Sequence, residues 1–107
     1  MIGIYKITCT KNNKIYIGSS KNIKNRIHIH KKSLCNNNHR NKFLQNAWNK
    51  YGEINFLFEV VEECDIDNLL NREEYWINTT NSYLRDYGFN ICKIPNSPLG
   101  YKHTDEN

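Results

Sequence analysis

Hydrophobic and polar residues follow two periodic patterns along this chain, and each pattern predicts a type of secondary structure. Two short β-branched and aromatic runs, at 2–7 and 15–17, flank the polar stretch 11–14. This pattern predicts a β-hairpin with an asparagine-rich turn. A third strand is expected at 56–61, where five of the six residues are apolar.

Other stretches carry apolar residues at the spacing of an α-helix. The first begins after Ser20 or Asn22, and either side chain can cap it. Its expected buried face consists of Ile23, Ile27, His30 and Leu34. A second helix is expected over 43–51, and Gly52 ends it.

A third expected helix has Asp65 or Asp67 as its cap. Its apolar positions are Leu69, Leu70, Trp76 and Ile77. The order β-β-α-α-β-α predicts an α+β domain, with a small, mainly antiparallel three-stranded sheet flanked by helices. We place this domain at residues 1–94, and we interpret 95–107, which holds both prolines of the chain, as a linker.

Charge is divided unevenly between the two halves of the chain. Residues 1–52 contain eleven Lys and Arg but no Asp or Glu, whereas residues 53–107 contain eleven acidic and four basic side chains. The halves therefore stand at +11 and −7, which gives the net charge of +4. This asymmetry favours a polyanion as partner, and nucleic acid is the commonest one. The alternative is that the two halves neutralise each other in the fold.

Composition argues against a membrane protein and against a zinc domain. No apolar stretch approaches the ~20 residues that span a bilayer, and the first residues lack the pattern of a signal peptide. The four cysteines, at positions 9, 35, 64 and 92, are too far apart for the close pairs of a structural zinc site. We expect an intracellular protein with reduced cysteines and no membrane partner.

The first expected helix carries a candidate phosphate site. Arg26 and His30 are four residues apart, so their side chains project from neighbouring turns. Two adjacent donors, with Lys24 and Lys31 close by, suit a phosphate and the charge that builds on it during hydrolysis. An ordinary solvated helix face is the alternative.

The third expected helix carries an unusual carboxylate. Glu73 has apolar residues at every helical neighbour on its face, so we expect it to point toward the core. A buried, unpaired carboxylate is unfavourable and needs a cation, a donor or a proton. A salt bridge to an arginine and a bound divalent metal are both consistent with this position.

The hairpin supplies two tyrosines and two unexpected glycines. Tyr5 and Tyr16 lie on paired strands and can approach each other across the ladder, although tyrosines in strands are more often packing residues. Gly3 and Gly18 are less expected, because glycine weakens a strand unless another group comes close to it.

The hairpin sequence resembles a known family. Gly3-Ile4-Tyr5, followed after ten residues by Tyr16-Ile17-Gly18, resembles the motif that names the GIY-YIG nucleases. Further residues typical of the family follow in the family's order: Arg26 with His30, His39, Arg72-Glu73 and Gly88-Phe89-Asn90-Ile91. Within the family, the chain is most similar to the catalytic domains of phage intron-encoded homing endonucleases. The resemblance implies an endonuclease that hydrolyses phosphodiester bonds in DNA with Mg²⁺ or Mn²⁺.

The resemblance also implies roles at the matching positions. Glu73 is expected as the only protein ligand of the metal, and Arg26 is expected to bind the phosphate and stabilise the transition state. Tyr5 is expected to position or deprotonate the attacking water, with Tyr16 as its partner or competitor for that role. His30 is expected to form hydrogen bonds within this cluster or to relay a proton.

Other positions are expected to support the site. Asn90 is expected to hold its geometry. Contacts with the substrate are expected from Lys14, Gly18, Lys24, Lys31 and His39. The segment 97–106 resembles the start of a modular DNA-binding motif found after such domains.

The sequence is also consistent with alternatives to a homing enzyme. A repair or restriction nuclease of the same family, or a DNA-binding module without catalysis, explains the same sequence. A purely structural domain explains the fold but leaves the basic half and Glu73 unexplained. We expect a monomer, with a transient dimer on DNA as one route to double-strand cleavage.

Overall fold

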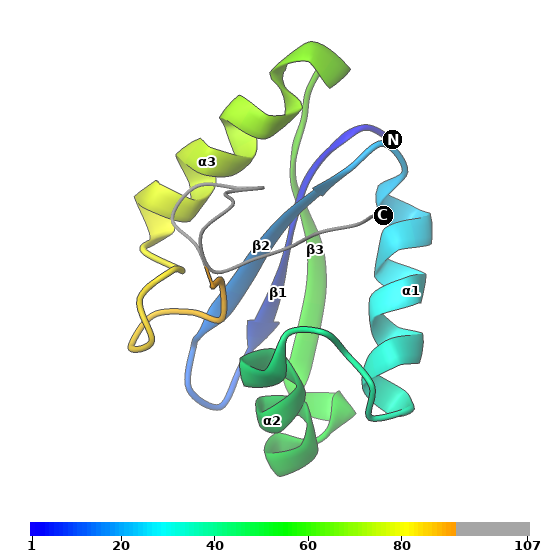
Figure 1. The fold of residues 1–107 in the computed structure, drawn as a ribbon, viewed down its shortest axis with the longest axis vertical. Helices are drawn as coiled ribbons and strands as arrows, with labels where there is room; N and C mark the ends of the chain where they lie inside the picture. The colour runs from blue at the N-terminus through cyan, green and yellow to red at the C-terminus, as the bar shows by residue number, and fades with distance from the viewer. Residues whose placement is uncertain (92–107) are drawn as a thin grey trace.

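The sheet at the centre of the molecule has three antiparallel strands in the order β2-β1-β3 (Figure 1). The strands are β1 (Gly3–Cys9), β2 (Ile15–Ser20) and β3 (Phe56–Glu63). This computed structural model describes residues 1–91, so the expected linker at 95–107 and the domain end at 94 lie outside the described residues. The α+β class predicted from the element order is confirmed.

The asparagine-rich turn joins β1 to β2 as predicted. Asn13 has a φ of 62°, a left-handed conformation that asparagine tolerates better than most residues. The side chain of Asn12 accepts a hydrogen bond from the backbone of Lys14, and the N–H of Cys9 donates to the carbonyl of Lys14. These bonds fix the register of the two strands that carry the tyrosines.

Three helices flank the sheet: α1 (Ile23–Cys35), α2 (Lys42–Tyr51) and α3 (Leu69–Thr80). Asn22 caps α1 by accepting a hydrogen bond from the N–H of Asn25, which selects Asn22 over Ser20 as the cap. Gly52 ends α2 with a φ of 88°, as expected for a C-terminal glycine. Short 3₁₀ turns, Glu53–Asn55 and Ile66–Asn68, precede β3 and α3.

The predicted start of the third helix was wrong. Neither Asp65 nor Asp67 caps it, because a 3₁₀ turn occupies this segment and α3 begins only after Asn68, with no side-chain cap. The predicted inner position Leu70 is 49% exposed. Leu70 is displaced by about 100° around the helix from Leu69, and it is the face of Leu69 that packs on the sheet.

The core lies in two layers because the side chains of β1 alternate between the two faces of the sheet. Tyr5 and Ile7 pack with residues of α1 and α2, whereas Ile4 packs with Ile17 and with Ile77 of α3. Figure 1 shows α3 on one side of the sheet and α1 and α2 on the other. A functional site that uses both Tyr5 and α3 must therefore lie at the rim of the sheet.

Close approaches explain the two motif glycines. A Cβ at Gly3 would lie 2.1 Å from the backbone oxygen of Glu62, beside an irregularity in the pairing of β1 with β3. A Cβ at Gly18 would lie 2.4 Å from the Cζ and Oη atoms of Tyr5. Both glycines are thus required by packing, as their unusual position in strands suggested.

We expect Gly18→Ala to displace the ring of Tyr5 and to lower the free energy of unfolding by roughly 1–3 kcal/mol. Urea denaturation of the variant measures this loss. Lys21→Ala, an exposed change just beyond the same strand, is the matched control and should stay within about 0.5 kcal/mol of the parent chain. Equal stability of the two variants would contradict the packing role of Gly18.

Two further expectations concern the cysteines and the absence of a membrane-spanning helix. Cys9, Cys35 and Cys64 are free thiols, and Cys92 lies outside the described residues. Within residues 1–91, no helix has the length and apolar character needed to cross a bilayer.

Candidate active site

Three buried side chains form a continuous hydrogen-bonded row on the α1 side of the sheet. The hydroxyl of Tyr5, on β1, lies 2.6 Å from Nε2 of His30, on α1. Nδ1 of His30 lies 2.7 Å from Nε2 of His39, and the two imidazole rings are stacked with centroids 5.0 Å apart. Tyr5, His30 and His39 are all less than 10% exposed, so their polar atoms depend on one another as partners.

His39 occupies a different position from the substrate contact expected for it. It lies behind His30, in the loop that joins α1 to α2, and is only 6% exposed. Two contacts hold it there: its N–H donates to the side chain of Gln45, and its Nδ1 accepts from the N–H of Asn41. The structure therefore places His39 in contact with another catalytic candidate and away from the surface.

Burial dominates the electrostatics of this row. Desolvation, followed by the charges of His39 and Arg26, lowers the pKa of His30 to about 3. Desolvation also lowers the pKa of His39 to about 4, and the charges of Lys42 and Arg40 act in the same direction. Both imidazoles are thus neutral near pH 7.

Tyr5 is a neutral phenol in this environment. Its burial, and then the nearby Tyr16 and Glu73, raise the pKa of Tyr5 well above its ordinary value, while Arg26 acts in the opposite direction. Tyr16, on β2, meets the ring of His30 edge-on, with centroids 5.5 Å apart. The structure therefore brings both motif tyrosines to His30.

Glu73 reaches the same neighbourhood from α3. Its Oε1 accepts a hydrogen bond of 2.6 Å from the hydroxyl of Ser19, near the end of β2, which confirms the predicted inward orientation. Desolvation raises the pKa of Glu73 to about 7, while the Ser19 bond and the charge of Arg26 lower it. The charge of Arg26 acts on the pKa of both Glu73 and Tyr5, and Glu73 acts on that of Tyr5, so the three groups lie near one another at the rim of the sheet.

Neighbouring contacts hold α3 in place for this arrangement. Arg72 donates through Nε to both carboxylate oxygens of Glu62, on β3, at 3.0 and 3.1 Å. The indole of Trp76 donates to the same carboxylate. Arg72 thus fastens α3 to the sheet, and Glu73, the next residue, projects toward Ser19.

The donor set fits a single hard cation. Within residues 1–91, no group of three or more His, Cys, Asp or Glu side chains gathers as a metal cage. Mg²⁺ keeps several water ligands and is often held by one or two carboxylates together with substrate phosphates. A half-buried carboxylate such as Glu73, whose pKa is raised by desolvation, gains from a nearby cation, so this residue suits a one-ligand site.

Asn90 clamps the edge strand beside the site. Its Oδ1 accepts from the N–H of Ile17 and its Nδ2 donates to the carbonyl of Ile17, at 2.8 and 2.9 Å. Ile17 stands between Tyr16 and Gly18, so these two bonds fix the backbone that carries both. Asn90 is 6% exposed, and its position suits the supporting role expected for it.

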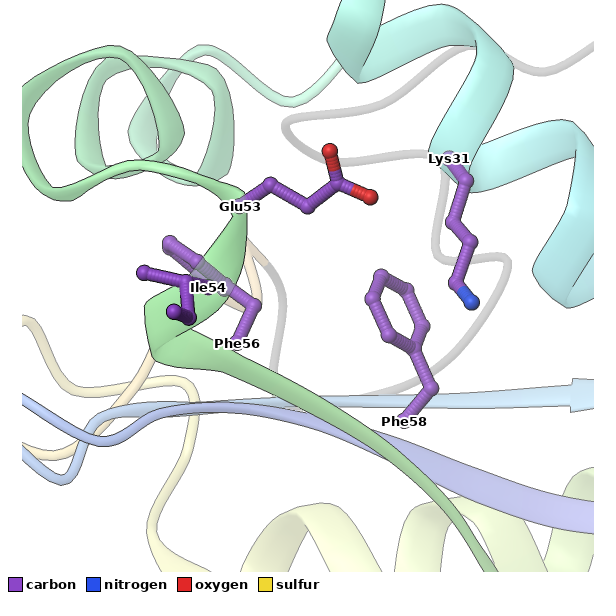
Figure 2. A pocket seen from close by; sticks show the side chains of 5 residues that line it. All are labelled: Lys31, Glu53, Ile54, Phe56 and Phe58. Carbon is purple, nitrogen blue, oxygen red and sulfur yellow. The ribbon is translucent and has the colours of Figure 1, made fainter.

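The expected lysine contacts lie outside the hydrogen-bonded row. Lys24 is exposed on α1, and Lys14 is half-buried beside the hairpin turn. Lys31 extends over β3, with its Nζ 4.9 Å from the centre of the Phe58 ring (Figure 2). There it borders an open hollow of about 500 Å³, which is lined by Lys31, Glu53, Ile54, Phe56 and Phe58.

Sequence reasoning missed three residues that organise the site. Ser19 holds Glu73, Asn41 links the loop to the end of the described chain through a bond to the Phe89 carbonyl, and Gln45 holds the loop from α2. Asn41 had a usable signal, because an asparagine just before a helical stretch is a typical cap, and its Oδ1 does accept from the N–H of Leu44. Ser19 and Gln45 gave no such signal, since their partners are distant or in an irregular loop.

Two solved structures of an endonuclease catalytic domain are similar to this chain. A glutamate-to-alanine mutant of the catalytic domain of intron endonuclease I-TevI is similar with a TM-score of 0.77 and 36% identity, over 86% of this chain and 94% of that one. The catalytic domain of homing endonuclease I-TevI is similar with a TM-score of 0.76 and 35% identity, over 84% and 99% of the two chains.

Sequence comparison agrees with the fold. Intron-associated endonuclease 1 of Enterobacteria phage T4 is 38% identical over 92 residues, covering 84% of this chain and 36% of the relative. A probable intron-encoded endonuclease 1 of Neurospora crassa is 34% identical, covering 97% of this chain and 34% of the relative. The chain thus spans about a third of the length of these two relatives. The sequence profile of the GIY-YIG catalytic domain matches residues 1–87, and the chain belongs to the GIY-YIG family.

Proposed function

We propose that this chain is the catalytic domain of a metal-dependent DNA endonuclease of the homing type. The observation that carries the proposal is that Arg26, from α1, lies close enough to Glu73, from α3, and to Tyr5, from β1, for its charge to act on the pKa of both groups. A carboxylate can hold a divalent ion, a fixed positive charge can stabilise a phosphate in the transition state, and a phenol hydroxyl can orient water, so this set of groups suits phosphodiester hydrolysis. The named endonucleases that resemble the chain support the same assignment.

In the proposed reaction each residue has a separate task. Glu73 holds Mg²⁺ or Mn²⁺, which when bound polarises the scissile phosphate and offsets its developing charge. Arg26 binds a phosphate oxygen and stabilises the added negative charge of the transition state. Tyr5 orients the attacking water through its hydroxyl, while Tyr16 lies against the same imidazole and competes for that task.

DNA is the proposed substrate because of where the positive charge lies. The basic half of the sequence forms β1, β2, α1 and α2, and many of its lysines are exposed, including Lys24 on α1. Such charge attracts a polyanion without reading its sequence. We therefore propose weak, salt-dependent binding by this domain as a monomer inside the cell, with a transient dimer on DNA for double-strand cleavage.

Plasmid cleavage tests the proposal. Supercoiled plasmid is incubated with the purified chain in Mg²⁺, Mn²⁺ or EDTA, and the nicked and linear forms are quantified over time. Cleavage that requires the divalent ion, and is absent in EDTA, is the expected result.

Retention of DNA in a gel shift without cleavage under any of these conditions would refute the endonuclease. That result would support the second candidate, a DNA-binding module of the same fold, because binding through lysines needs no metal. Cleavage in EDTA would instead remove the metal from the proposal.

A further inference from the structure

A buried row of hydrogen bonds connects a backbone amide to the hydroxyl of Tyr5. The N–H of Asn41 donates to Nδ1 of His39 at 3.0 Å. Nε2 of His39 lies 2.7 Å from Nδ1 of His30, and Nε2 of His30 lies 2.6 Å from the oxygen of Tyr5. Each imidazole uses both of its nitrogens, so the position of the proton on one ring determines its position on the next.

The backbone N–H of Asn41 at one end of the row determines the direction in which each hydrogen bond is donated. A backbone N–H can only donate, so Nδ1 of His39 must accept and carries no proton. Since both imidazoles are neutral, His39 carries its proton on Nε2 and donates it to Nδ1 of His30. Nδ1 of His30 is then an acceptor, and the proton of His30 must lie on Nε2, facing Tyr5.

We propose that His39 is a positioning residue, which holds His30 as a hydrogen-bond donor to the oxygen of Tyr5. The hydroxyl proton of Tyr5 then points away from His30 and is available to a water or phosphate oxygen in the site. His30 does not accept this proton; it stabilises negative charge on the Tyr5 oxygen. The inference rests on the proposed function only in assigning Tyr5 a part in cleavage.

The loop geometry supports a positioning role for His39. His39 is buried, and its own N–H donates to Gln45, whose side chain also bonds to the carbonyl of Leu34 at the end of α1. The loop is therefore tied to the helix that carries His30. A side chain held in this way can orient a neighbouring ring, as carboxylates and carbonyls orient histidines in other sites.

Nitrogen-15 NMR of the histidine rings tests the direction of the row without substrate or metal. Protonated and unprotonated ring nitrogens resonate separately, so the tautomer of each ring can be assigned. At pH 7 we expect the Nε2–H tautomer for both His30 and His39, with exposed His28 on α1 as the reference within the molecule. A proton on Nδ1 of His30 would reverse the direction in which the hydrogen bonds are donated and would overturn the proposal.

Variants at His39 test its effect on the reaction. His39→Leu removes the donor, and we expect a mixed tautomer at His30 and a cleavage rate lowered on the order of ten- to a hundred-fold, with DNA affinity unchanged. His39→Gln, whose amide can donate again, should restore part of the rate, and His28→Leu is the control that should alter neither property.

These measurements separate the two proposals. If the parent chain does not cut DNA, the endonuclease is refuted, while the ring tautomers still decide the direction of the row. If His39→Leu leaves the tautomer of His30 unchanged, His39 is not the positioning residue, whatever the cleavage rate.

Discussion

Glu73→Gln is expected to lower the rate of DNA cleavage by about a thousand-fold or more while leaving DNA binding intact or tighter. The change keeps the shape of the side chain and its contact with Ser19, but it removes the charge that would hold the proposed metal. Removal of a negative charge near Arg26 also favours binding of a phosphate. Single-turnover cleavage and a gel shift measure the two effects separately.

Glu74→Gln is the matched control for this variant. Glu74 is the adjacent acid on α3 and is also half-buried, but its carboxylate makes no hydrogen bond to Ser19 or Tyr5. Normal cleavage by Glu74→Gln, together with loss of cleavage in Glu73→Gln, would identify Glu73 rather than its neighbour as the residue that holds the metal. The reverse result would move the metal site to Glu74 and contradict the proposed arrangement.

Arg26→Ala is expected to lower the single-turnover rate by about a hundred-fold, which corresponds to roughly 3 kcal/mol of transition-state stabilisation. The charge of Arg26 acts on Glu73, Tyr5 and His30, so it lies close to the groups that form the proposed site. Arg26→Lys should recover only part of the rate, because lysine keeps the charge but loses the planar pair of donors.

Lys24→Ala separates this effect from simple attraction of DNA. Lys24 is exposed two residues away on the same helix, so its loss should weaken binding and reduce the salt dependence by about one phosphate contact, with little effect on the rate of bound complex. If Arg26→Ala behaves in the same way, Arg26 is a phosphate contact without a role in the transition state.

A pH dependence of stability follows from the two buried histidines. Their folded pKa values of about 3 and 4 lie below the ordinary value of 6.5, so the unfolded chain binds more protons between about pH 4 and pH 6.5. Stability should therefore fall as the pH drops through this window, by roughly 1 kcal/mol per pH unit for each histidine. Glu73, with its raised pKa, acts in the opposite direction and offsets part of the loss.

Urea denaturation between pH 4 and pH 7 measures this slope. His39→Gln removes one of the two groups and should make the slope shallower, whatever its stability at pH 7. A steeper slope in the variant, or stability that rises toward pH 4 in the parent chain, would contradict neutral, buried imidazoles.

The sequence alone determined features that depend on neighbouring residues. The asparagine-rich turn between the first two strands and the helix end at Gly52 follow from the backbone preferences of asparagine and glycine. For the first helix the sequence offered Ser20 or Asn22 as the cap, and the structure selected Asn22. The inward orientation of Glu73 follows from its apolar neighbours at helical spacing. The motif resemblance also identified the family that the comparisons confirm.

The tertiary structure decided which distant residues meet. Ser19 and Glu73 are 54 positions apart and Tyr5 and His30 are 25 apart, and no periodicity specifies how the helices that carry them dock on the sheet. The burial of His39 depends on a loop that contacts from α2 hold in place. Helical spacing gives the face on which a side chain lies, but its partner is set by long-range packing, which is why the row from Asn41 to Tyr5 emerged only from the fold.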